Sequence, residues 1–249
     1  MQSFKAVFLN EMERLVKRKK FLAVALVSLI SIALGQVIVV LIKHLSGINV
    51  AGASVFPMLV LSVFSYSIIP LFGVFAAADL FAGEFSSNTM KLTLSRPVSR
   101  FKIFTAKVTA AAVFVASHFI LTMALSVASS IIASGFKLDF MAVFIAYTVN
   151  FFPVFVFVLL AVLLSNILKG PTSVFMVSIL AYIVLWVLGV LFSSCSSLFI
   201  VPLFDWFTFF TGSIVNIWKI LRTLVIILSM GGLLFSAGYF MFEKRKISG

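Results

Sequence analysis

The amino-acid sequence predicts an all-α, polytopic membrane protein with six transmembrane helices, and three observations predict it. Hydrophobic residues make up 63% of the 249 residues and charged residues only 10%, which leaves too few polar side chains to coat a soluble domain. The apolar runs are continuous over about twenty residues or more, as in a membrane helix, whereas a barrel strand alternates apolar and polar positions. Basic residues gather beside these runs, as they do on the cytoplasmic side of membrane proteins.

Residues 1–20 are expected to form an N-terminal amphipathic elbow helix that lies in the headgroup plane. Apolar side chains recur there at helical spacing, and the charged residues lie mostly off their stripe. The stripe consists of Phe4, Phe8, Met12 and Leu15. The basic run at 17–20 then marks the cytoplasmic edge of the first span.

Each predicted span is an apolar run that can cross the ~30 Å hydrocarbon core at ~1.5 Å per residue. The six runs are 21–42, 55–78, 104–134, 141–165, 171–192 and 220–242. The third is longer than one crossing requires, so we expect it to tilt or to project from the bilayer. Pro70 in the second run and Pro153 in the fourth each remove a backbone hydrogen bond and are expected to kink their helices.

The net charge of +12 reflects membrane topology rather than nucleic-acid binding. With both termini in the cytoplasm, fifteen basic residues lie on the cytoplasmic side and four lie outside. This asymmetry fits the positive-inside rule, and it is the reason for the predicted orientation.

Segment 193–219 is apolar and aromatic, yet it contains Pro202 and Asp205. A seventh span here would move the basic C-terminal residues to the outside, against the charge rule. We therefore expect an external re-entrant or interfacial hairpin before the last span. It should break at Pro202 and hold Trp206 and Trp218 at headgroup depth.

Several kinds of chemistry leave no signature in the sequence. There is no GxxxxGK[ST], HExxH or GxSxG motif, so neither a phosphate-binding loop nor these hydrolytic sites are indicated. The single cysteine, Cys195, cannot form an intrachain disulfide, and no His/Cys cluster indicates a metal. His118, inside the third span, is expected to be neutral and bonded to a serine or a carbonyl. We expect no catalytic residue, no bound cofactor and no energy source in this chain.

Residues 79–103 are expected to form a cytoplasmic loop that contains a short, capped helix. Asp79 and Glu84 stand near its start, where carboxylates favour the positive end of the helix dipole. The helix should end at Arg96-Pro97, because a residue before proline avoids the α conformation. Ser99 is placed to cap the third span, whose first turn carries Arg100.

The whole chain resembles the permease subunits of type-2 ATP-binding-cassette (ABC) exporters. Those permeases have a basic elbow helix, six spans and a hairpin before the last span. Their loop between spans two and three has an acidic residue, a threonine before an apolar patch, and a Pro-x-Ser-Arg ending. The matching positions here are Glu84, Thr89, Met90, Leu92, Leu94 and Pro97 to Arg100. Asn88 stands where the family often has glycine.

The resemblance implies that two permease chains pair in the membrane and that each docks on a cytosolic ATPase. ATP and Mg would bind the ATPase, so this chain would be neither an enzyme nor a cofactor-binding subunit. The residues that would couple ATP binding to the spans are Asp79, Glu84, Thr89, Arg96, Pro97, Ser99 and Arg100. Those of the elbow that would brace them are Glu11, Arg14 and Arg18. The expected location is a bacterial inner or plasma membrane, with both termini cytoplasmic.

The predicted spans offer aromatic and methionine side chains that would suit an amphipathic or apolar cargo, such as a peptide, an antibiotic or a lipid-like molecule. The candidate cavity residues are Tyr66, Phe72, Phe75, Phe155, Phe175 and Met176. Three alternatives stay open. A non-transport assembly or sensor protein needs no ATPase, an ion-coupled carrier needs an ion gradient, and a lipid-modifying enzyme needs a polar catalytic cluster at one membrane surface.

Overall fold

The computed structural model is helical and has no β-strand within the ranges that it describes, which are residues 2–17, 19–46, 55–87, 98–134, 138–211 and 216–245. Its α-helices are α1 (Gln2–Val16), α2 (Lys19–Ser46), α3 (Val55–Tyr66), α4 (Ile68–Leu80), α5 (Ala82–Ser86), α7 (Arg100–Ser134), α8 (Phe140–Ile167), α9 (Pro171–Leu191), α10 (Thr208–Thr211) and α11 (Ile217–Lys244). Two short 3-10 helices, η1 (Ser193–Leu198) and η2 (Val201–Asp205), precede α10.

Six helical stretches of the described chain are long and apolar enough to cross a membrane. They lie in α2, in α4 with α5, and in α7, α8, α9 and α11. This confirms the prediction of an all-helical chain with six membrane-length apolar helices. α3 is also apolar but shorter, at 12 residues.

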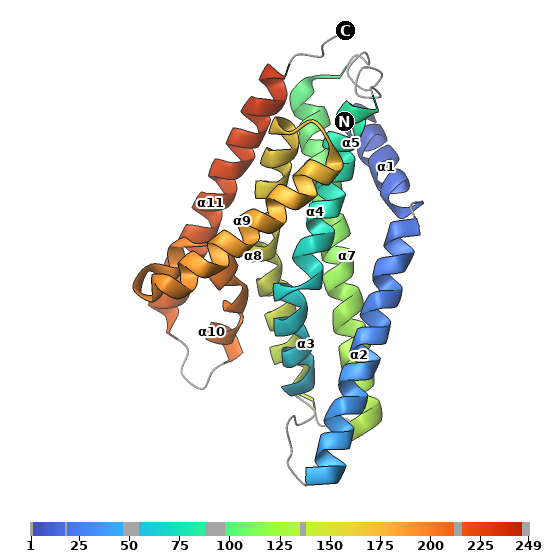
Figure 1. Ribbon diagram of the computed structural model, residues 1–249, viewed down its shortest axis with the longest axis vertical. Coiled ribbons are helices and arrows are strands. Elements are labelled where there is room, and N and C mark those ends of the chain that lie inside the picture. The colour runs from blue at the N-terminus through green and yellow to red at the C-terminus, as the bar shows by residue number, and fades with distance from the viewer. Residues whose placement is uncertain are drawn as a thin grey trace.

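Helices α4, α7 and α8 form the centre of the bundle. Figure 1 shows α11 on one side of them, α2 on the other, and α9 crossing obliquely in front of α8. Gly73 allows the close approach of α4 to α8, because a Cβ atom at this position would overlap the Val158 side chain. The outer helices α2, α9 and α11 instead leave most of their apolar side chains uncovered.

The predicted span at 55–78 consists of two helices, α3 and α4, which are separated at Ser67. The backbone of Ser67 is not helical, with φ −123° and ψ −77°. Pro70 has no N–H to donate to the carbonyl of Tyr66, four residues earlier. The hydroxyl of Tyr182 on α9 donates to that carbonyl instead, at 2.6 Å. The break is therefore bridged from a neighbouring helix, whereas α8 continues through Pro153 without interruption.

Residues 193–211 fold back against the bundle as η1, η2 and α10. The hydroxyl of Tyr66 donates to Asp205 Oδ2 at 2.8 Å, which ties η2 to the end of α3. Gly189 on α9 lets Pro202 approach so closely that a Cβ atom at position 189 would overlap the proline ring. Trp206 is buried by protein, whereas Trp218 at the start of α11 is exposed. Thus only one of the two tryptophans predicted at headgroup depth is free to face headgroups.

Candidate functional site

A buried ion cluster joins three helices at the end of the molecule where α1 begins and α11 ends (Figure 1). Its centre is Lys107, in the second turn of α7, whose side chain is fully buried. The Lys107 Nζ donates to Glu11 Oε1 of α1 at 2.8 Å and to the carbonyl of Leu80 at 2.9 Å. It also lies 2.7 Å from Glu84 Oε1 of α5. One ammonium group therefore connects α1, the end of α4, α5 and α7.

Arg14 completes the cluster, which we define as Glu11, Arg14, Glu84 and Lys107. The Arg14 guanidinium donates to Glu84 Oε1 and lies 4.0 Å from Glu11 Oε2. Two carboxylates and two cations make the cluster neutral overall, and this balance is what permits the burial of charge. Each carboxylate keeps one oxygen, Oε2, that is buried and without a hydrogen-bond partner in the described part of the chain.

The pattern of α1 explains how it reaches the cluster. Its buried face consists of Val7, Glu11 and Leu15, which recur every four residues and so share one side of the helix. The predicted apolar stripe shares Leu15 with this face, and its members Phe8 and Met12 are half-buried and pack against the core. Glu11 lies between Val7 and Leu15 on this buried face and therefore points inward.

The five-residue helix α5 is held from its other side by aromatic and cation–π contacts. The Arg245 guanidinium, just after α11, lies 3.8 Å from the centre of the Phe85 ring. It donates to the carbonyls of Ser165 and Leu168 at the end of α8, at 2.8 and 2.9 Å. Burial lowers the pKa of the Arg245 guanidinium, but arginine stays protonated in proteins. Phe242 of α11 also packs edge-on against the Phe85 ring.

Other predicted coupling residues lie at the same end of the bundle. Asp79 is buried near the end of α4. Ser99 directly precedes α7, and its carbonyl accepts the Ile103 N–H at 3.2 Å. Arg100 is exposed and donates to the carbonyl of Glu243 in the last turn of α11 at 2.6 Å. Four predicted residues lie outside the described ranges: Arg18, Thr89, Arg96 and Pro97.

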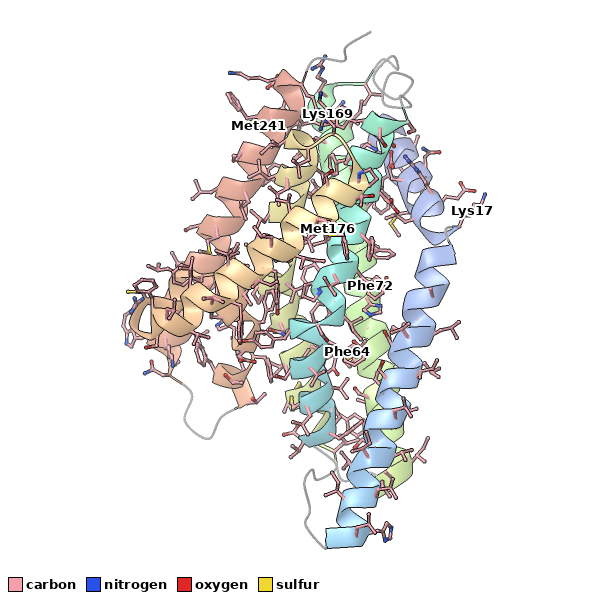
Figure 2. All side chains as sticks on the ribbon, viewed as in Figure 1. Lys17, Phe64, Phe72, Lys169, Met176 and Met241 are labelled. Atoms are coloured by element: carbon pink, nitrogen blue, oxygen red, sulfur yellow. The ribbon has the colours of Figure 1, made fainter. Side chains whose placement is uncertain are left out.

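Only some of the predicted cargo residues lie together. Phe75 of α4 stacks on Phe175 of α9 with ring centres 4.2 Å apart, and Phe72 lies 6.2 Å from Phe75. Tyr66 is bound to Asp205. The other two lie elsewhere: Phe155 stacks on Phe151, and Met176 is 62% exposed on the outside of α9 (Figure 2). A cavity of about 290 Å³ between α7 and α8 is lined by none of the six.

A polar face runs down the long helix α7. His118, Thr122, Ser126 and Ser130 recur every four residues, and all four are buried. As expected, His118 is bonded to a serine, with its Nε2 3.1 Å from Ser28 Oγ of α2. The Ser126 hydroxyl meets the Tyr147 hydroxyl at 3.0 Å. The described residues hold no group of three or more His, Cys, Asp or Glu side chains that could bind a metal.

Two residues of the site were missed by sequence reasoning. Lys107 was counted only as part of the basic flank of the third span, although a lysine between Ala106 and Val108 in an apolar helix signals a buried partner. Arg245 was read only as a topology signal. Nothing in the local sequence indicates that it reaches the end of α8, because that contact spans 80 residues of chain.

Comparison with known protein families adds one match. A family model described as a protein of unknown function, DUF2705, matches residues 45–248, which is most of the chain. No curated protein matches this sequence.

Proposed function

Because the chain belongs to the DUF2705 family, whose description names no activity, we propose a function from its own sequence and structure. We propose that it is the membrane-spanning permease subunit of an ATP-driven ABC exporter. A separate cytosolic subunit would bind ATP and Mg and hydrolyse the ATP. Two permease chains would together carry an amphipathic or apolar cargo, such as a peptide, an antibiotic or a lipid-like molecule, out of a bacterial cell.

The observation that carries this proposal is the buried ion cluster. A five-residue helix is too short to be stable alone, so the position of α5 depends on its anchors. Glu84 holds it to α1 and α7, and Phe85 holds it to the residues that follow α11. A push on α5 would therefore move several helices together, as an energy-coupling element must. A loop that served topology alone would not need buried, mutually paired charges.

The surroundings of α5 support a docking role for this end of the molecule. Ser86 and Ser87 at the end of α5 are exposed, so a partner can reach them. The exposed cations Lys102, Lys169 and Lys244 lie near the ends of helices at the same end; Figure 2 labels Lys169 there. Their charge would attract an acidic rim on a cytosolic partner. The positive-inside rule favours the cytoplasm for this end, with both termini inside.

The length of α7 supports an interfacial position for the cluster. Its 35 residues extend over ~52 Å, well beyond the ~30 Å hydrocarbon core. Lys107 is seven residues after Arg100, or ~10 Å along the helix. We propose that this part of α7 projects into the headgroup layer with α1 beside it as the elbow helix. Residues 193–219 would then form the external hairpin at the opposite side.

The test is co-purification of the tagged chain from native membranes in mild detergent, followed by identification of its partners. Ser86→Arg places a large cation on the exposed face of α5 without touching the buried cluster. Thr208→Arg is the matched control, because Thr208 is also exposed but lies on α10, away from α5 (Figure 1). A stoichiometric P-loop ATPase that Ser86→Arg releases and Thr208→Arg retains is the expected result.

Two results would contradict the proposal. Purification of the intact chain without any ATPase would favour an assembly or sensor protein. Transport by the purified chain alone, driven by an ion gradient without ATP, would favour a secondary carrier. In either case the ion cluster would be a structural brace rather than a coupling element.

A further inference from the structure

A cavity of about 290 Å³ lies between α7 and α8 and opens to the outside of the bundle. Its α7 wall runs from Ala116 to Met123, and its α8 wall runs from Phe144 to Phe152. Two of the residues that line it, Ile120 and Phe144, are 62% and 57% exposed, so the cavity can be reached from the membrane. None of the described residues that line it is charged. Such a lining suits an uncharged, apolar occupant.

The cavity is kept open by aromatic rings that hold one another in place. The Phe151 ring stacks on the Phe155 ring, with ring centres 5.5 Å apart. It also meets the rings of Phe119 on α7 and Phe152 on α8 edge-on, at 6.2 and 5.7 Å. Because these rings interlock, they cannot swing into the gap, and the atoms around an empty space lose dispersion contacts. A molecule that fills the cavity therefore stabilises the protein.

Thr148 of α8 adds one unpaired polar group to this lining. The residue is exposed, so an outside molecule can contact it. Threonine hydroxyls in helices can donate to the carbonyl four residues earlier, as Thr109, Thr122 and Thr223 do at 2.7, 3.0 and 2.8 Å. The Thr148 hydroxyl makes no such bond to Phe144 and no other within the ranges that the structure describes. An unpaired donor is costly in hydrocarbon, so the occupant should supply an acceptor.

The depth of Thr148 indicates the source of that acceptor. Ser126 is 19 residues after Lys107 on α7, or ~28 Å, which is nearly the full thickness of the ~30 Å hydrocarbon core. With Lys107 at one headgroup layer, Ser126 lies near the other. The Ser126 hydroxyl meets the hydroxyl of Tyr147, the residue before Thr148, at 3.0 Å. Thr148 therefore lies close to the ester groups of the leaflet far from the ion cluster. Ala116, ~13 Å from Lys107, lies near the midplane.

We propose that the α7–α8 cavity binds one acyl chain of a glycerolipid in this leaflet, with the ester carbonyl accepting a hydrogen bond from Thr148. A cavity of ~150 Å³ holds one benzene ring, so about 290 Å³ has room for a large part of one acyl chain. The chain runs from Thr148 toward Ala116, the direction in which lipid tails point in this leaflet. The inference takes from the proposed function only the position of Lys107 at a headgroup layer, and it needs neither an ATPase nor transport.

The test is native mass spectrometry of the full chain, delipidated in detergent and titrated with a diester phosphatidylethanolamine. The matched probe is the diether lipid with the same headgroup and chain lengths, which lacks both carbonyls. One hydrogen bond should make the diester lipid bind roughly 2- to 10-fold more tightly to the wild-type protein. Thr148→Val, which is nearly isosteric, should bind both lipids equally. Thr109→Val is the matched control and should keep the preference, because the exposed Thr109 already donates to the Thr105 carbonyl.

A second variant tests the position of the chain. Ala116→Phe fills the end of the cavity near the midplane and should weaken binding of both lipids several-fold. Ala128→Phe is its control, because Ala128 is an exposed alanine of α7 that does not line the cavity. If Ala116→Phe does not fold, Thr148→Val still decides the question, since it changes one exposed side chain without changing its size.

Four outcomes would overturn the inference. These are equal affinity of the wild-type protein for the two lipids, an ester preference that survives in Thr148→Val, lipid binding that is unchanged in Ala116→Phe, and a co-purified protein that blocks lipid binding at this cavity. The last result would assign the cavity to a partner helix. The proposed function fails separately, because the absence of an ATPase partner would alter none of these lipid affinities.

Discussion

Lys107 on α7 and Glu84 on α5 form a buried ion pair, with the ammonium nitrogen 2.7 Å from the carboxylate oxygen Oε1. The same nitrogen holds Glu11 of α1, which lies 96 residues earlier in the sequence, so a single charge joins α1 to α5 and α7. Breaking a buried pair leaves an uncompensated charge, which costs more than the pair itself contributes. Removal of one charge from the cluster should therefore affect both the stability of the protein and the proposed coupling.

Glu84→Leu and Lys107→Leu should each destabilise the protein by about 3–5 kcal/mol, because each leaves unbalanced charge in the cluster. The double variant should cost less than the sum of the two, since the remaining Glu11 and Arg14 are again neutral together. Thermal unfolding in detergent measures all three. If the two effects simply add, the residues are not coupled and the cluster does not act as one unit.

Tyr182→Phe should destabilise the protein by about 1–3 kcal/mol, because the carbonyl that Pro70 leaves free would lose its donor. In a Pro70→Ala background the restored N–H can bond to that carbonyl, so the same change should cost less. Tyr239→Phe is a matched control, since the Tyr239 ring packs on Phe101 and Phe104 and its hydroxyl has no hydrogen bond within the described chain. If Tyr182→Phe destabilises the wild-type and Pro70→Ala proteins equally, the Tyr182 hydroxyl does not replace the hydrogen bond that Pro70 lacks.

Gly73→Ala should destabilise the protein by about 1–3 kcal/mol, because the added methyl group would overlap Val158 where α4 and α8 pack together. Gly232→Ala is the control: a Cβ atom there has no neighbour within 4 Å. That change should leave stability nearly unaltered. The unfolding midpoints of the two variants provide the measurement. Similar midpoints would mean that α4 and α8 move apart enough to accommodate the added methyl group at little cost.

Tyr66→Phe should loosen residues 193–211, because it removes the hydroxyl that bonds to Asp205. We expect faster hydrogen exchange in η2 and α10 and little change in α8. Asp205→Asn should have a smaller effect, since an amide oxygen can still accept from the tyrosine. Exchange that is unchanged in Tyr66→Phe would show that packing of Phe204 and Trp206 alone holds this segment.

The positions of the long helices were predictable from the sequence because they depend on local composition. Apolar runs and their flanking basic residues mark α2, α7, α8, α9 and α11 to within a few residues. The family resemblance implied a coupling role for Glu84 and a bracing role for Arg14, but it did not predict that the two side chains form an ion pair. The partners of Lys107 were missed, because nothing in the local sequence indicates that Glu11, 96 residues earlier, and Glu84 lie beside it.

The sequence by itself determined that this chain is a helical membrane protein, since lipid solvation demands long apolar runs and self-satisfied backbones. Only the tertiary structure decided which side chains meet. Pairs such as Tyr66 with Asp205 or Arg245 with the end of α8 join residues about 80 to 140 positions apart. No local sequence pattern encodes such contacts, because they depend on how helices with similarly apolar faces pack against one another.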